Sequence, residues 1–195
     1  MNNLKRAIGI LINPKYEWEI IKTEQTTTTK LFKNYAMLIA LIPAVAIFIG
    51  QSVIGLSLGE KMTYRIPIIN GILFSSVYYA FNLLGLYLLA KFVDVLSQTF
   101  GAEKNFSSSL KVVIYSFTPF AAAGIVRIVI SFEWLHLILG LYTFYLMYLG
   151  LKTVKEIKPE KLPGYLTIVF MISVILYMVS EKIAVEITMP VFGQL

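Results

Sequence analysis

Five long apolar stretches alternate with short polar segments along the chain, and each is long enough to cross a lipid bilayer. A spanning helix needs about 20 mostly apolar residues, because hydrocarbon offers no hydrogen-bonding partner to the backbone. The pattern therefore predicts an all-α, polytopic integral membrane protein with five transmembrane helices. We place the spans at Leu31–Ile54, Ile68–Leu96, Leu110–Ser131, Trp134–Leu151 and Gly164–Glu186.

A more polar segment, residues 1–30, precedes the first span. In LKRAIGILI, apolar residues recur at helical spacing beside two cations, a pattern typical of a helix lying at a membrane interface. A second short helix, PKYEWEIIK, begins with Pro14 after Asn13, a candidate N-cap. The threonine-rich QTTTTK that follows disfavours helix and predicts a hinge. We expect a cytoplasmic amphipathic segment over 1–30 and a transmembrane domain over 31–190.

Composition agrees with a lipid environment. Hydrophobic residues make up 57% of the 195 residues and charged residues only 14%, whereas a soluble domain carries roughly a quarter charged residues. Cysteine is absent, which excludes disulfides and thiolate chemistry, and the single histidine, His136, has no second ligand of its kind. We therefore expect no metal, no cofactor and no catalytic site.

The distribution of lysine and arginine predicts the orientation. With the N-terminus in the cytoplasm, 13 of the 17 basic residues fall on the cytoplasmic side, and only Lys61, Arg65, Arg127 and Lys182 fall outside. The positive-inside rule thus favours a cytoplasmic N-terminus and an external C-terminus. The net charge of +6 then indicates contact with anionic lipid at the cytoplasmic face, and gives no reason to expect nucleic-acid binding. Candidate contacts to lipid or partner proteins at that surface are Lys5, Arg6, Lys15, Trp18 and Lys22.

The third span contains a proline and runs into a stretch of small residues, AAAG at 121–124. Pro119 removes one backbone hydrogen bond and kinks the helix, and hydroxyls such as those of Ser116 and Thr118 offset that loss in membranes. The small residues allow another helix backbone to approach closely. A kinked packing helix is the favoured interpretation, and a kink that lines a pathway or ligand pocket is the alternative.

Two further polar residues fall within the spans. Arg127 lies near the outer end of the third span, where it can extend to the interface or pair with Glu133, His136 or Glu181. Asn82 is the polar side chain nearest the middle of the membrane, and either an interhelical hydrogen bond or contact with a permeant explains it. These two residues, with Ser116, Thr118 and Pro119, form the candidate intramembrane polar site.

Several motifs together resemble the Yip family, the membrane proteins with a Ypt/Rab-interacting-protein domain. They are NPKYEWEII at 13–21, YSFTPF at 115–120, LYTFYLMYLGLKTV at 141–154, and a final span after KLPGY. The resemblance implies a five-helix bundle with a cytoplasmic N-terminus. Eukaryotic members are associated with Rab GTPases, but this short chain is more similar to the prokaryotic branch, so Rab binding is not carried over. The resemblance implies location in the plasma (inner) membrane of a prokaryote and supplies no catalytic residue.

Two functions remain open from the sequence. The leading hypothesis is a non-enzymatic scaffold or adaptor that presents its basic cytoplasmic face to anionic lipid or to membrane and cytosolic proteins, with homo-oligomers as one form of assembly. The alternative is a small channel or transporter for an ion or small solute, with a pathway past Asn82, Pro119 and Arg127. A polar cavity at the middle of the membrane favours the second, and a closely packed interior favours the first.

Overall fold

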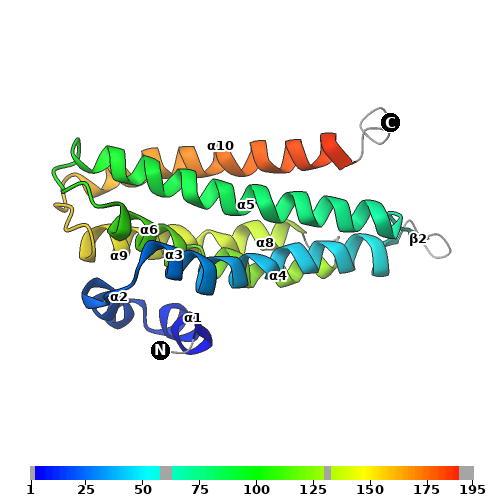
Figure 1. The fold of residues 1–195 in the computed structure, drawn as a ribbon, viewed down its shortest axis with the longest axis horizontal. Coiled ribbons are helices and arrows are strands. Elements are labelled where there is room, and N and C mark those ends of the chain that lie inside the picture. The colour runs from blue at the N-terminus through cyan, green and yellow to red at the C-terminus, as the bar shows by residue number, and fades with distance from the viewer. Residues whose placement is uncertain (1–2, 58–62, 130–132, 189–195) are drawn as a thin grey trace.

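A computed structural model describes residues 3–57, 63–129 and 133–188 as an elongated bundle of helices (Figure 1). The described elements are α1 (Asn3–Ile12), α2 (Pro14–Thr23), α3 (Thr28–Leu31), a π-helical segment (Phe32–Ala36), α4 (Met37–Phe48), a second π-helical segment (Ile49–Ile54), β1 (Leu56–Ser57), β2 (Thr63–Tyr64), α5 (Ile68–Ser97), α6 (Phe106–Ser116), α7 (Thr118–Ala123), a 3-10 helix (Gly124–Ile128), α8 (Glu133–Gly140), α9 (Tyr142–Thr153) and α10 (Leu162–Thr188). Helix dominates the described residues, as the apolar pattern predicts.

Five continuous helical stretches are long and apolar enough to cross a membrane, which confirms the predicted class. They run over Thr28–Ile54, Ile68–Ser97, Phe106–Ile128, Trp134–Thr153 and Leu162–Thr188. The described ends of these helical stretches lie within four residues of the predicted span bounds. The ends placed at Ser131 and at residue 190 lie outside the described residues. The predicted hinge is shorter than expected, because Thr27 caps a helix that already begins at Thr28.

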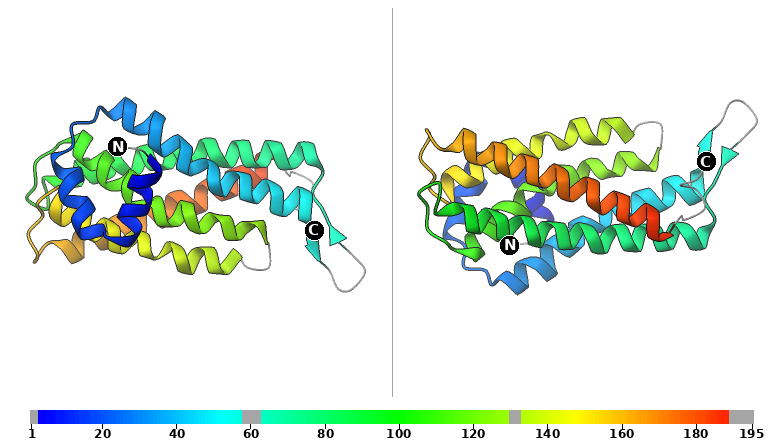
Figure 2. Two further views of the ribbon diagram at one scale, coloured as in Figure 1. Left: turned by 90° about the horizontal axis from the view of Figure 1, so that it is seen from below. Right: turned by 90° about the horizontal axis from the view of Figure 1, so that it is seen from above.

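The two ends of the bundle differ in content. One end, here called the N-terminal end, holds α1, α2 and the connectors α5–α6 and α9–α10, while the β1–β2 hairpin and the last turn of α10 lie at the opposite end (Figure 1). Antiparallel pairing of Leu56 with Tyr64 forms that hairpin. Helices α5 and α10 run side by side along the bundle, with α8 and α9 on its other side (Figure 2).

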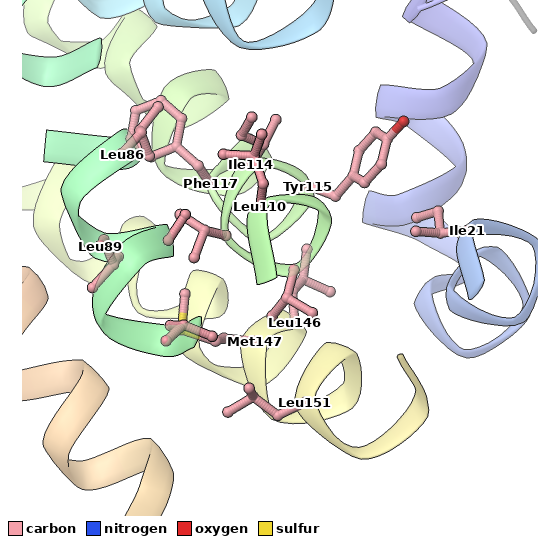
Figure 3. Close-up of a cluster of buried hydrophobic side chains, with 14 of the residues drawn as sticks. Ile21, Leu86, Leu89, Leu110, Ile114, Tyr115, Phe117, Leu146, Met147 and Leu151 are labelled. Atoms are coloured by element: carbon pink, nitrogen blue, oxygen red, sulfur yellow. The ribbon is translucent and has the colours of Figure 1, made fainter. Parts of the chain in front are cut away.

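The third span is the centre of the bundle. Within its most apolar window 78% of residues are buried inside the protein, against 17% to 44% for the other four spans. Figure 3 shows Leu110, Ile114 and Phe117 from this span meeting Leu86 of α5 and Leu146 of α9. The kinked helix is therefore the one that the other four surround.

Small residues bring the first span, in α4 and in the second π-helical segment, against the 3-10 helix, as predicted for the AAAG stretch. A Cβ added at Gly124 would lie 2.6 Å from the Cβ of Pro43, and one at Gly50 would lie 2.3 Å from the Arg127 carbonyl oxygen. Both distances are too short for any side chain, so glycine is required at both positions for this approach.

Helices α1 and α2 pack on the side of the bundle at its N-terminal end (Figure 1). Ile10, Trp18 and Ile21 are fully buried by this packing. The Trp18 ring lies against Gly150 of α9, where an added Cβ would be 2.8 Å from the indole, and it meets the Tyr115 ring edge-on at 6.4 Å. Pro14 opens α2 as expected, but the Asn13 side chain makes no capping hydrogen bond.

Replacing Trp18 by alanine tests whether this packing holds the N-terminal helices. Removal of a fully buried indole costs about 3–5 kcal/mol, so Trp18→Ala should release α1 and α2 and raise the rate of trypsin cleavage after Lys22 and Lys30. The exposed tryptophan Trp134 supplies the matched control, because Trp134→Ala should leave that rate unchanged. Equal cleavage of Trp18→Ala and the unmodified protein would contradict the packing.

Candidate functional site

A cluster of buried charges joins the N-terminal helices to the third span. We call Arg6, Glu17, Glu24, Lys111 and Tyr115 the Arg6 cluster. Arg6 donates through one guanidinium nitrogen to Glu17 and through the other to Glu24, at 3.0 Å. Arg6 is 4% exposed and Glu17 8%, so this pair is almost completely removed from solvent. A buried ion pair is retained only when its hydrogen bonds are satisfied, and here both carboxylates bind one guanidinium.

Lys111 and Tyr115 extend the cluster from α6. The Lys111 ammonium donates to the carbonyl oxygens of Ile21, at 3.1 Å, and Glu24, both at the end of α2. A cation at the last carbonyls of a helix satisfies groups that have no helical partner. The Tyr115 hydroxyl donates to Glu24 at 3.4 Å, and the Arg6 guanidinium lies 5.7 Å from the centre of the Tyr115 ring. The cations of Arg6 and Lys111 thus balance the carboxylates of Glu17 and Glu24 at the N-terminal end of the bundle.

The predicted surface contacts divide into two groups. Lys5, Lys15 and Lys22 are exposed, whereas Arg6 and Trp18 are buried in the contacts described above. The structure therefore places Arg6 and Trp18 away from lipid and partners, because α1 turns its Arg6 and Ile10 side toward the bundle. Lys22 forms an ion pair with Glu156 at 2.6 Å, and this hydrogen bond raises the pKa of the Lys22 ammonium and lowers that of the Glu156 carboxyl.

The kink at Pro119 is satisfied by one of the two predicted hydroxyls. Pro119 has no N–H for the Tyr115 carbonyl oxygen, and the Thr118 hydroxyl donates to that oxygen at 2.8 Å. Because the Thr118 hydroxyl is used as a donor there, the Tyr35 hydroxyl donates to it, at 2.9 Å. Ser116 is also buried, but its hydroxyl has no hydrogen-bonding partner in the described structure. The kink is thus held by Thr118 and by Tyr35 from the first span.

Arg127 forms an ion pair with Glu181 of α10, one of the three predicted partners. Its guanidinium lies 2.8 Å from the Glu181 carboxylate and 5.2 Å from the centre of the Tyr78 ring. The Tyr177 hydroxyl also donates to Glu181, at 2.8 Å. His136 instead contacts the Phe120 carbonyl oxygen at 3.1 Å. The side chain of Glu133 lies outside the described part.

An apolar cavity of about 380 Å³ lies between α5, the α6–α7 kink, α8–α9 and α10. Asn82 lines it, but Arg127 is not among its described lining residues, and Pro119, Ser116 and Thr118 are not either. The five candidate intramembrane residues are therefore not brought together in one site. Asn82 faces the cavity, Thr118 and Pro119 form the kink, and Arg127 belongs to the ion pair with α10.

Sequence reasoning missed the Arg6 cluster and also Thr143, a cavity-lining residue whose hydroxyl is buried and has no partner in the described structure. Lys111, the second residue of the predicted third span, was the available signal, since a cation within a span needs either the interface or a specific partner. Its partners are 87 and 90 residues away in the chain, and no local pattern identifies them.

Neutralising Arg6 tests the charge cluster. Arg6→Met leaves the buried Glu17 carboxylate without its partner and should destabilise the docked N-terminal helices by about 3–5 kcal/mol. The double variant Arg6→Met/Glu17→Met should recover most of that loss, because two apolar side chains replace the pair. The stability of the single and the double variant is measured by unfolding in detergent and by the rate of trypsin cleavage after Lys30. A double variant as unstable as the sum of the single ones would show that the pair is not coupled.

The two hydroxyls near the kink should respond differently to removal. Thr118→Val leaves the Tyr115 carbonyl unsatisfied in a dry environment, which costs about 1–3 kcal/mol, while Thr118→Ser should retain stability. Ser116→Ala removes a hydroxyl that has no partner and should cost close to nothing. Thermal unfolding in detergent compares the three, and equal losses for Thr118→Val and Ser116→Ala would contradict the assignment.

Comparison with known proteins identifies the same family as the sequence motifs. The family model described as the Yip1 domain matches residues 8–180. Two relatives are the inner membrane protein YohC from Escherichia coli strain K12 and from Escherichia coli O6:H1, each 24% identical over 157 residues that cover 78% of this chain and 80% of the relative. No solved structure gave a significant match.

Proposed function

The chain belongs to the Yip1 domain family of membrane proteins, and from this premise we propose that it is a non-enzymatic scaffold or adaptor of the bacterial inner membrane. Its E. coli relatives are named inner membrane proteins. In this proposal the N-terminal end faces the cytoplasm, which the count of basic residues supports. The docking surface is α1, and its primary partner is the anionic lipid of the cytoplasmic leaflet.

The outer face of α1 is the observation that carries the proposal. Leu4, Ile8 and Ile12, each one turn apart, are 66%, 48% and 79% exposed, and Lys5 lies beside them. The opposite face of the same helix is fixed to the bundle through Arg6 and Ile10. An apolar stripe with flanking lysines is the pattern of a helix that inserts into the interface of an anionic membrane. Because the Arg6 cluster fixes its inner face, α1 is presented in one orientation.

The exposed lysines supply the electrostatic part of this attraction. A lysine near an anionic surface contributes about 1 kcal/mol to the free energy of membrane binding. Lys5 and Lys15 each add a contribution of this size. The Lys22–Glu156 ion pair links α2 to the α9–α10 connector and is already used within the protein. In this proposal the end of the bundle is rigid, binds lipid through α1 and carries exposed lysines. These features support a scaffold function more directly than a catalytic one.

The channel or transporter alternative is supported by one observation, that Asn82 lines the cavity. The described residues that line this cavity carry no charge and are mostly hydrocarbon, which disfavours an ion or a hydrated solute. Of the other two residues on the hypothetical pathway, Pro119 does not line the cavity and Arg127 is held by Glu181. Flux of potassium or of a small zwitterion through reconstituted vesicles separates the two functions, since a scaffold shows none above protein-free vesicles.

The lipid contact can be tested in the chain of 195 residues, which has no cysteine. With a single bimane-labelled cysteine in Ile12→Cys, brominated lipid should quench the label strongly in vesicles that contain phosphatidylglycerol and weakly in phosphatidylcholine alone. Adding Lys5→Gln and Lys15→Gln should lower the quenching in the anionic vesicles toward the neutral value, because two lysine contributions of about 1 kcal/mol are lost.

A matched pair of substitutions controls for net charge. Lys104→Gln with Lys158→Gln removes the same charge from exposed connector positions at the same end of the bundle, and should leave the quenching unchanged. Quenching that is insensitive to anionic lipid, or equal losses in the two pairs, would contradict the proposed lipid contact of α1.

A further inference from the structure

The fourth span is divided into two helices near its middle. Helix α8 ends at Gly140 and α9 begins at Tyr142. Between them the backbone has the tighter 3-10 spacing, because the Leu141 N–H donates to the Ile138 carbonyl at 3.1 Å and the Phe144 N–H donates to the Leu141 carbonyl at 3.0 Å. The third span is also divided, at the kink between α6 and α7, and α6 packs beside α9 while α7 packs beside α8. Both divisions therefore lie at the same level of the bundle, and a 3-10 turn within a long helix often marks a hinge.

The two halves beyond these divisions are held differently. The α7 half, which includes the 3-10 helix, is fixed to α4 by the glycine contacts described above and to α10 by the Arg127–Glu181 ion pair at 2.8 Å. Helix α8 packs against this half, and its two buried residues in the described part, His136 and Gly140, both lie against Phe120. The His136 ring is 4.3 Å from the Phe120 ring, centre to centre, and a Cβ added at Gly140 would lie 2.7 Å from the same ring.

Most of the remaining surface of α8 is exposed. Trp134, Leu137, Ile138 and Leu139 are 58%, 48%, 54% and 46% exposed. Within a bilayer the surrounding lipid is as apolar as these side chains, so no hydrophobic driving force presses α8 onto the bundle. Contact with the α7 half therefore carries the attachment of α8.

The apolar cavity of about 380 Å³ separates α8 from α10 and leaves room for α8 to turn. Leu137 lines it from α8 and Met178 from α10. These two residues lie at a similar level, because their neighbours in the chain, His136 and Tyr177, both meet the Phe120 ring, with centres 4.3 Å and 5.5 Å away. Turning α8 toward α10 narrows the cavity and brings apolar side chains of the two helices into dispersion contact.

Tyr142 ties the division in the fourth span to the N-terminal segment. Its hydroxyl donates to the Leu11 carbonyl oxygen at 3.1 Å, which belongs to the last turn of α1, where carbonyls have no partner within their own helix. Helix α1 is itself fixed by the Arg6 cluster, and the Trp18 ring of α2 lies against Gly150 of α9. The residue that follows the hinge is thus bound to a docked and anchored helix.

We propose that α8 is a hinged arm that turns about Leu141 toward α10, and that docked α1 holds this arm in the described position through the Tyr142 hydroxyl. While α1 is docked, the hydrogen bond to Leu11 fixes the first turn of α9 and with it the angle at which α8 joins. When α1 leaves the bundle, this fixed point is lost and α8 turns to narrow the cavity. The N-terminal segment thereby controls the shape of the distal half of the bundle. This link requires only that α1 docks, and it does not rest on the proposed lipid contact.

The rate at which a disulfide forms across the cavity measures this movement. The chain has no cysteine, so Leu137→Cys with Met178→Cys places one thiol on each side, and iodine, which dissolves in lipid, oxidises the pair in vesicles. The rate is proportional to the population of the closed conformer. Tyr142→Phe removes the hydroxyl and keeps the ring, and should raise the rate about fivefold, the change expected for the loss of one neutral hydrogen bond.

Tyr145→Phe is the matched control. The Tyr145 ring stacks on that of Tyr142, and its hydroxyl makes no hydrogen bond within the described residues, so this variant should leave the rate unchanged. A second cysteine pair, Phe144→Cys with Phe170→Cys, joins α9 to α10 where the two rings have centres 4.5 Å apart. Its rate should not respond to Tyr142→Phe, because α9 lies on the fixed side of the hinge.

Releasing α1 by another route tests the link to the N-terminal segment. Trp18→Ala or Arg6→Met should raise the rate of the pair across the cavity by at least as much as Tyr142→Phe does. Adding Tyr142→Phe to either variant should give no further rise, because both changes act through the same contact. Melting temperatures verify that each variant is folded.

Three results would overturn the proposal. The first is an unchanged rate in Tyr142→Phe, and the second is an equal rise in Tyr145→Phe or in the cysteine pair that joins α9 to α10. The third is a further rise when Tyr142→Phe is added to Trp18→Ala or Arg6→Met, since the Tyr142 hydroxyl would then act independently of α1.

Discussion

The structure depends on one constraint: a charged side chain or a freed backbone group inside hydrocarbon must find its partner within the protein. The third span is the most demanding case, because it carries Lys111, the Tyr115 carbonyl freed by Pro119, and Arg127. Lys111 binds the end of α2, Arg127 binds Glu181 of α10, and the Tyr115 carbonyl accepts from the Thr118 hydroxyl of its own span, which in turn is bound by Tyr35 of the first span. These partners explain why this span lies at the centre, since only a central helix can be reached from so many sides.

The same constraint explains how the N-terminal segment is held. Helix α1 has an amphipathic pattern, yet its cation Arg6 is directed inward to Glu17 and Glu24, and apolar Ile8 and Ile12 are directed outward. Apolar contact alone would hold α1 and α2 only weakly against the apolar surface of the spans. Within a bilayer the surrounding lipid is equally apolar, so there is no hydrophobic driving force between helices. Charged hydrogen bonds and the Trp18 contact with Gly150 supply the specificity.

Much of the fold could be predicted from the sequence, because apolar length and charge are local properties. The five spans and the close approach at Gly124 follow from residues at known depth, and depth also narrows the partners of Arg127 to three and the hydroxyls at the kink to two, but not to Glu181 and Thr118. The inward direction of Arg6 and the burial of Trp18 could not be predicted in this way. Both depend on which face of α1 and α2 meets α6 and α9, and that is decided by residues about 90 or more positions later in the chain. The cavity at Thr143 likewise needs four spans in place.

Lys111 has a consequence for the order in which the protein is made. Helix α2 leaves the ribosome early, but the cation that caps its last turn follows 90 residues later, which at about 5–20 residues per second is a delay of roughly 5–18 seconds. During that interval the first two helices lack their final anchor. During synthesis, α2 is therefore complete before its last turn can be capped. The cap forms only when the third span, which carries Lys111, has been made.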